Sequence, residues 1–315
     1  MELQTNISLS PESDQIDYAS EVLLLGSCFA ENIGDKLEYY KFRNTVNPFG
    51  IVFHPLALER LLSRAVNNRA YVAEDIFQRG ELWYCFEAHS EVRDEQPEAL
   101  LTRLNSLLQV LRSGIGNATH IVLTLGTAWG YRHPQAEGIV ANCHKVPQKE
   151  FSKELSSVEA LSEGLETVVE DIKKLNAEAR IIFTVSPVRH LKDGFVENSL
   201  SKAHLLTAVH KLGATHTDVS YFPAYEILMD ELRDYRFYAD DMIHPSAKAV
   251  DIIWERFATV WISSETAELQ NKIAEIQKGM THRPFNPDSA DHKRFLETLQ
   301  TKKLAVIAQL PHISF

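Results

Sequence analysis

The chain has 315 residues, and its hydrophobic fraction of 44% with 24% charged residues is typical of a compact globular protein rather than a disordered, collagen-like or coiled-coil one. Its 32 lysines and arginines stand against 43 acidic residues, and the net charge of −11 disfavours binding to nucleic acid or to an anionic membrane surface. No apolar run approaches the ~20 residues that span a bilayer, the N-terminus lacks the basic and apolar stretches of a secretory signal, and the three cysteines form no C-x-x-C pair. We therefore expect a cytoplasmic protein.

Short apolar runs at residues 22–25, 121–125 and 181–185 predict strands. Each run is followed by glycine or serine and hardly alternates between apolar and polar residues, which is typical of a strand buried on both faces of a parallel sheet. Amphipathic helical patterns lie between the runs, at 29–37 and 161–172, and after the last run, at 250–261. This alternation predicts a doubly wound α/β fold with a mainly parallel sheet.

The chain divides into two parts of different composition. Residues 1–262 carry the α/β pattern, with an insertion near 68–110 that combines two short strands, at 71–72 and 82–86, with a helix. Residues 263–315 predict a helical C-terminal extension that is interrupted by a proline-containing helix breaker. The apolar residues of its first helix share one face: Leu269, Ile273, Ile276 and Met280.

The turn after the first predicted strand carries a candidate nucleophile. In doubly wound sheets, ligands bind beside the loops at the carboxyl ends of the strands. At this point Gly26 permits a sharp turn, and Ser27 stands at a helix N-terminus, where unpaired N–H groups and the helix dipole stabilise negative charge. Acyl transfer requires such an oxygen beside such donors, although serine is also a preferred N-cap.

A candidate base precedes the last helix of the α/β part. Pro245 disfavours a helical conformation at His244 and suits the first turn of the helix that follows, so His244 is expected on a loop. Asp241, three residues earlier, is close enough to accept a hydrogen bond from the imidazole, as the carboxylate of a Ser–His–Asp triad does. The alternative is a surface turn with a local Asp–His pair.

Together the two segments resemble the SGNH (GDSL-type) hydrolase superfamily, in which the nucleophile follows the first strand and the acid and base share one late loop. Residues 26–30, Gly-Ser-Cys-Phe-Ala, are moreover the signature of the GSCFA family, whose members look like a branch of that superfamily. The resemblance covers about residues 20–260. It implies a flavodoxin-like three-layer sandwich and a serine esterase without a cofactor, in which Ser27 attacks, His244 is the base and Asp241 orients it.

The resemblance also implies an oxyanion hole. Gly50 matches a glycine whose N–H, together with that of Ser27, faces the oxyanion. After the second predicted strand the superfamily usually has Gly-x-Asn-Asp, but Ala128 stands where that asparagine is expected and its side chain donates no hydrogen bond. Thr127 and Asn142 are candidates for the missing donor, and ordinary loop hydrogen bonding is the alternative for both.

The register of the nucleophile leaves two residues open. In the superfamily motif Gly-Asp-Ser the nucleophile is the second residue after glycine, which is Cys28 here, and a thiolate at a helix N-terminus would be activated. We favour Ser27, because a shift of one residue at the end of a strand is easily accommodated. Cys28 is then a small apolar residue that packs under the helix.

The remaining candidate site residue is a histidine. His190 follows the predicted strand at 181–185 and so reaches the same edge of the sheet, where it is placed to bind substrate or to serve the structure of its loop. No pair among the 13 histidines has the spacing of a metal site beside carboxylates, and the sequence has no glycine-rich phosphate loop. The sequence therefore predicts neither a metal nor a cofactor.

These features predict an enzyme that removes a small O-acyl group from a carbohydrate or a small metabolite. An O-acyltransferase would use the same acyl-enzyme, with a sugar hydroxyl in place of water. A binding module on a catalytically inactive version of the fold is the third possibility, and the absent asparagine is its best support.

Overall fold

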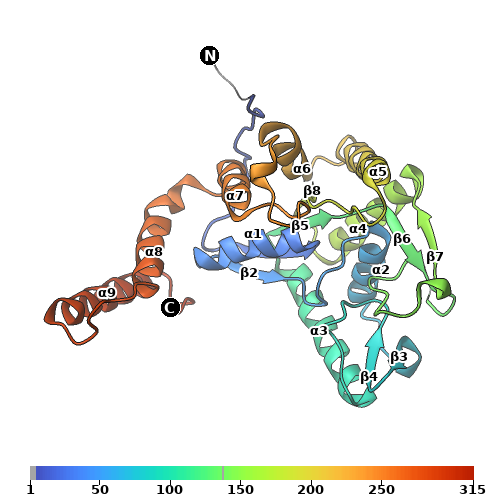
Figure 1. The fold of residues 1–315 in the computed structure, drawn as a ribbon, viewed down its shortest axis with the longest axis horizontal. Helices are drawn as coiled ribbons and strands as arrows, with labels where there is room; N and C mark the ends of the chain where they lie inside the picture. The colour runs from blue at the N-terminus through green and yellow to red at the C-terminus, as the bar shows by residue number, and fades with distance from the viewer. Residues whose placement is uncertain (1–4, 137) are drawn as a thin grey trace.

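A parallel sheet of five strands forms the centre of the computed structural model, which describes residues 5–136 and 138–315 (Figure 1). The first four residues of the predicted α/β part thus lie outside the described residues. The strand order is β2-β1-β5-β8-β9, and all neighbouring strands pair in parallel. This is the order of a flavodoxin-like sheet. The strands are β1 (Glu21–Gly26), β2 (Arg43–Val46), β5 (His120–Leu125), β8 (Arg180–Val185) and β9 (Val219–Tyr221).

Helices cover both faces of the sheet, which confirms the predicted doubly wound α/β fold. Successive residues of β1 point to opposite sides, so Leu23 joins one hydrophobic core and Leu24 the other. One core is completed by α2 (Pro55–Val66), α3 (Pro97–Asn117), α4 (Val158–Leu175) and α5 (Phe195–Gly213). The other is completed by α1 (Cys28–Tyr39), α6 (Ala224–Glu226) and α7 (Ala247–Trp261). The apolar face predicted for each of α1 and α4 is buried as expected.

Two antiparallel hairpins and several short helical turns connect these layers. The hairpins pair β3 (Ile76–Arg79) with β4 (Leu82–Cys85) and β6 (Trp129–Arg132) with β7 (Ser152–Leu155). The short turns are η1 (Ala73–Asp75), η2 (Gln148–Glu150), η3 (Ile227–Glu231, a π-helical turn), η4 (Tyr235–Phe237) and η5 (Ser264–Thr266).

The prediction of a strand at residues 71–72, the first strand of the insertion, is wrong. The Asn105 side chain of α3 binds both the N–H and the C=O of Tyr71, at 2.8 and 3.0 Å, and so takes the groups that a partner strand would need. The partner of β4 is instead β3, which a tight turn containing Gly80 at φ +63° connects to it. The helix α3 also extends beyond the expected insertion and packs on the sheet.

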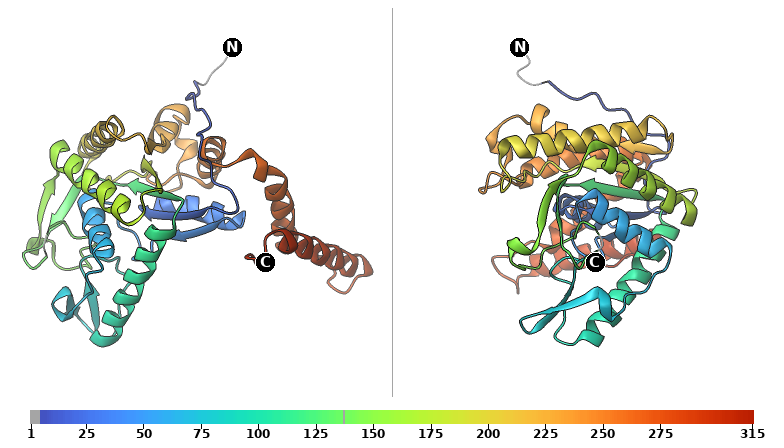
Figure 2. Two further views of the ribbon diagram at one scale, coloured as in Figure 1. Left: turned by 180° about the vertical axis from the view of Figure 1, so that it is seen from behind. Right: turned by 90° about the vertical axis from the view of Figure 1, so that its right-hand side faces the viewer.

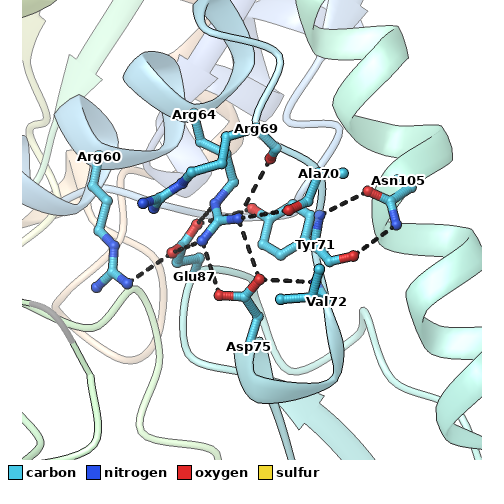
Figure 3. Close-up of polar contacts among 9 residues, drawn as sticks. All are labelled: Arg60, Arg64, Arg69, Ala70, Tyr71, Val72, Asp75, Glu87 and Asn105. Carbon is cyan, nitrogen blue, oxygen red and sulfur yellow. Dashed lines mark hydrogen bonds and ion pairs between the residues drawn. The ribbon is translucent and has the colours of Figure 1, made fainter.

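A buried cluster of charges fastens this hairpin to α2 (Figure 3). Arg64 of α2 donates to both carboxylate oxygens of Glu87, at 2.7 and 2.9 Å, and to Asp75 at 3.0 Å. The hydroxyl of Tyr71 donates to Glu87 at 3.0 Å, and Arg60 forms a 2.8 Å ion pair with the same carboxylate. The Arg64 and Glu87 side chains are almost fully buried, so this cluster holds the insertion in one position.

The C-terminal helical region contains α8 (Ala267–Met280) and α9 (Ala290–Gln309), and both stand out from the body of the molecule in opposite views (Figures 1 and 2). Ile273 and Ile276 of α8 are fully buried in the same core as α1 and α7. The region is therefore joined to the α/β layers through α8. Among the described residues, no helix has the length and apolar character that crossing a membrane requires.

Candidate active site

The turn between β1 and α1 has a geometry that only glycine accepts at its first residue. Gly26 has φ +127°, and a Cβ at this position would lie 2.1 Å from the carbonyl oxygen of Thr124 on the neighbouring strand. Its N–H donates to Asn47 Oδ1 at 2.9 Å. Asn47, which sequence reasoning did not single out, thus fixes the turn from the end of β2.

Ser27 stands at the carboxyl end of β1, where the sequence places it, and it is the N-cap of α1. Its Oγ accepts a hydrogen bond from the N–H of Phe29 at 3.2 Å, and its side chain is only 2% exposed. Cys28 is the first residue of the helix and is partly exposed. Two potential nucleophiles therefore occupy adjacent positions with different surroundings.

Asp241 and His244 form the hydrogen-bonded pair that their spacing predicts. Asp241 Oδ2 lies 2.7 Å from His244 Nδ1, and its Oδ1 accepts the N–H groups of Ile243 and His244 at 2.9 and 3.0 Å. These bonds, first of all the one from the His244 N–H, lower the pKa of Asp241 to about 2. The imidazole of His244 is 48% exposed, so water and substrate can reach it.

The loop that follows β8 lies against the Asp241–His244 loop. The N–H of Arg189 donates to the carbonyl of Ile243 at 3.2 Å. His190 is next in the chain, and its Nε2 is buried without a hydrogen-bond partner among the described residues. Burial, then the charges of Lys202 and His244, lower the pKa of His190 to about 3, so its ring is neutral. The role of His190, in binding substrate or in the structure of its loop, stays a prediction.

Lys202 of α5 is a site residue that sequence reasoning missed. Its side chain is 1% exposed, and its Nζ donates at 2.6 Å to the carbonyls of Gly126 and Ser186, which follow β5 and β8. Burial lowers its pKa to about 7, while the charge of Cys28 opposes that shift. The signal was present in the sequence, because Ser201 and Lys202 fall on the face of α5 that Leu205 and Val209 bury.

Neither N–H group expected in the oxyanion hole is free to bind a substrate oxygen in this structure. The Ser27 N–H donates to the carbonyl of Thr124 at 3.0 Å, and the Gly50 N–H donates to that of Asn47 at 2.7 Å. Gly50 adopts φ +72° in a tight turn, and a Cβ there would lie 2.4 Å from the side chain of His89. These contacts contradict the expectation that the two N–H groups face the oxyanion.

The remaining candidate donors make local contacts. Thr127 Oγ1 lies 2.8 Å from Ser201 Oγ at the end of β5 and accepts the N–H of Trp129. Asn142 lies nearer the insertion, where its Oδ1 accepts from Ser90 Oγ and from the N–H of His144, both at 2.8 Å. Their participation in an oxyanion hole stays a prediction. The described residues contain no group of three or more His, Cys, Asp or Glu side chains arranged to hold a metal ion.

Comparison with known proteins gives one family. A similar solved structure is that of a carbohydrate esterase family 3 from Talaromyces cellulolyticus, with 8% sequence identity, coverage of 80% of this chain and 98% of that chain, and a TM-score of 0.36. No curated protein matches the sequence. The model of the GSCFA family matches residues 21–257, and that of the GSCFA domain protein, C-terminal domain, matches residues 273–315. The chain therefore belongs to the GSCFA family.

Proposed function

We propose that the protein hydrolyses acyl esters through a covalent acyl-enzyme. The observation that carries this proposal is the accessible Asp241–His244 pair, whose loop is bonded to the loop after β8 at the same edge of the sheet as the start of α1. A carboxylate that fixes one tautomer of a histidine, near a hydroxyl or thiol at a helix N-terminus, supplies the base and the nucleophile of acyl transfer.

The reaction proceeds in two steps. A nucleophile of the Gly26 turn, for which the sequence favours Ser27 over Cys28, attacks the acyl carbon while His244 accepts its proton. His244 returns the proton to the departing alcohol, and then activates water to release the acid. Asp241 stabilises the imidazolium that forms in each step. The oxyanion donor that we propose is the N–H of Cys28 at the start of α1, since the N–H groups of Phe29 and Ala30 are bonded to Ser27.

The substrate that we propose is a small O-acyl group on a carbohydrate or metabolite. The half-exposed imidazole of His244 supports water as the acyl acceptor, because it leaves the base open to solvent. An added polyol tests the acyltransferase alternative. If the acylated polyol increases with polyol concentration at the expense of the free acid, the main reaction is acyl transfer rather than hydrolysis.

Replacement of His244 tests the proposed function. We expect His244→Ala to lower turnover of a p-nitrophenyl acyl ester by at least 10²-fold, because general base catalysis contributes about that much or more. The matched control is His216→Ala, since His216 Nε2 lies 2.6 Å from Glu166 in a comparable pair that precedes β9 at the opposite edge of the sheet. Equal turnover in the two variants would contradict the proposal.

A further inference from the structure

The two candidate nucleophiles differ in how much of their hydrogen-bonding capacity the fold already uses. Ser27 Oγ caps α1 by accepting the N–H of Phe29, and the Ser27 N–H is bonded to the carbonyl of Thr124. With 2% of its surface exposed, Ser27 would have to break its cap and leave its pocket to reach a substrate. Its contacts are those of a structural residue.

Cys28 is presented differently. It begins α1 and is partly exposed. Burial and then the charge of Glu31 raise the pKa of the thiol above its ordinary value, and the backbone N–H groups of Cys28 and Phe29 and the charge of Lys202 offset only part of that rise. The thiol is therefore the resting form of Cys28, and a base has to take its proton before it can attack.

Lys202 lies within the same group of side chains. Its ammonium is buried, and the partners of its Nζ are two carbonyl oxygens, which carry no full negative charge to offset that of the lysine. These carbonyls follow β5 and β8, and Cys28 follows β1, so the lysine and the thiol stand at the same edge of the sheet. His244 belongs to the loop that is bonded to the loop after β8.

We propose that Cys28 is the nucleophile of this site. The assignment rests on the proposed function. The thiol proton passes to His244, the Sγ bonds to the acyl carbon, and the ester C–O bond breaks as the alcohol takes the proton from His244. Water then attacks the thioester, which restores the thiol and releases the acid.

The position of the acyl group tests this assignment. The protein is incubated with p-nitrophenyl acetate, quenched in acid, digested and sequenced by mass spectrometry. We expect the acetyl group on Cys28, its release by neutral hydroxylamine as expected for a thioester, and its loss in Cys28→Ala. An acetyl group on Ser27 that resists neutral hydroxylamine would overturn the proposal.

Alkylation by iodoacetamide tests the thiol without any ester. The internal control is Cys143, which is also partly exposed but whose pKa burial raises to about 11. We expect Cys28 to react at least tenfold faster than Cys143 near neutral pH, since the thiolate is the reactive form. Equal rates would overturn the proposal. Fast alkylation of Cys28 in a protein without esterase activity would refute the ester substrate and support the nucleophile.

Discussion

Both carboxylate oxygens of Asp241 form hydrogen bonds within its own turn. One carboxylate oxygen accepts two backbone N–H groups and the other lies 2.7 Å from the ring of His244. Since these bonds lower its pKa to about 2, the carboxylate stays ionised at any pH at which an esterase is assayed. It can therefore orient His244 without taking its proton.

Substituting each of two neighbouring aspartates distinguishes the orienting role of Asp241 from a general effect of negative charge. We expect Asp241→Asn to lower kcat/KM by about 10²–10⁴, because an amide that donates to the imidazole selects the wrong tautomer. Asp240→Asn removes the same charge one residue away and is expected to cost far less. The reverse order would identify Asp240 as the orienting acid, and no effect from either would make the loop a structural turn.

The buried lysine makes stability depend on pH. Because burial lowers the pKa of Lys202 from 10.5 to about 7, the folded protein loses this proton at a lower pH than the unfolded chain. Between these values the unfolded state binds more protons, so the contribution of Lys202 to stability rises as the pH rises. Below about pH 7 both states are protonated and the buried ammonium carries its full desolvation cost.

Chemical denaturation at several pH values measures this contribution. The free energy of unfolding of the unmodified protein minus that of Lys202→Met is expected to increase from about pH 6 to about pH 10. Lys211→Met, on the exposed side of the same helix, is the control and is expected to show a much smaller trend. A difference that falls with rising pH would mean that the folded state holds the ammonium more tightly than the unfolded chain does.

Among the elements, the insertion hairpin depends on the charges that join it to α2 (Figure 3). Glu87 accepts from Arg64 and Tyr71 and pairs with Arg60, at a position where little water can replace a lost partner. Removing one member of a buried ion pair leaves the other member charged and unsatisfied.

We expect Glu87→Gln to destabilise the protein by about 3–5 kcal/mol, as measured by chemical denaturation. The control is Glu154→Gln in the hairpin of β6 and β7, where Glu154 and Arg132 form a 2.8 Å ion pair with both side chains substantially exposed. Exposed pairs contribute about 0–1 kcal/mol. Similar losses in the two variants would show that the cluster is no more important than a surface salt bridge.

Strands and the main helices were predictable because their apolar residues follow the period of the element. The runs at 121–125 and 181–185 lie in β5 and β8, and the faces of α1 and α4 are buried. The hairpin was predicted less well, because the side chain of Asn105, 34 residues away, binds the backbone of Tyr71, and the strand that pairs with β4 is residues 76–79 instead. Local patterns do not contain such long-range contacts.

For the site, the sequence predicted contacts within one turn better than contacts between elements. The pairing of Asp241 with His244 follows from their spacing of three residues. The occupied N–H groups of Ser27 and Gly50 depend on how strands and turns align, and the bonds of Lys202 join α5 to two different loops. A lysine on an apolar helix face was the one local sign of that arrangement.

At the scale of the whole molecule, α8 connects the C-terminal helices to the α/β layers. Ile276 is fully buried in the core that also contains residues of α1 and α7, and the neighbouring Gln277 donates to the carbonyl of Tyr39 at 3.0 Å. Because this contact forms part of a shared core, the C-terminal helices and the sheet are expected to unfold together.

Truncation of Ile276 tests this coupling. We expect Ile276→Ala to cost about 2–5 kcal/mol and to shift a single unfolding transition of the whole chain. Leu304→Ala on α9 is the control, since Leu304 is 57% exposed and surface substitutions change stability by about 0.5 kcal/mol or less. Two transitions, of which only one moves in Ile276→Ala, would show that the C-terminal helices form a separate folding unit.

The core that α1 shares with α7 also has a consequence for synthesis. The apolar face of α1 around Ile33 and Leu37 shares its core with residues of α7 such as Phe257 and Trp261, more than two hundred residues later in the chain. At a translation rate of ~5–20 residues per second, the ribosome needs about 10–45 s to synthesise the residues between these two helices. During this time a nascent chain exposes the helix that carries Cys28, and it is then that a chaperone would have most to bind.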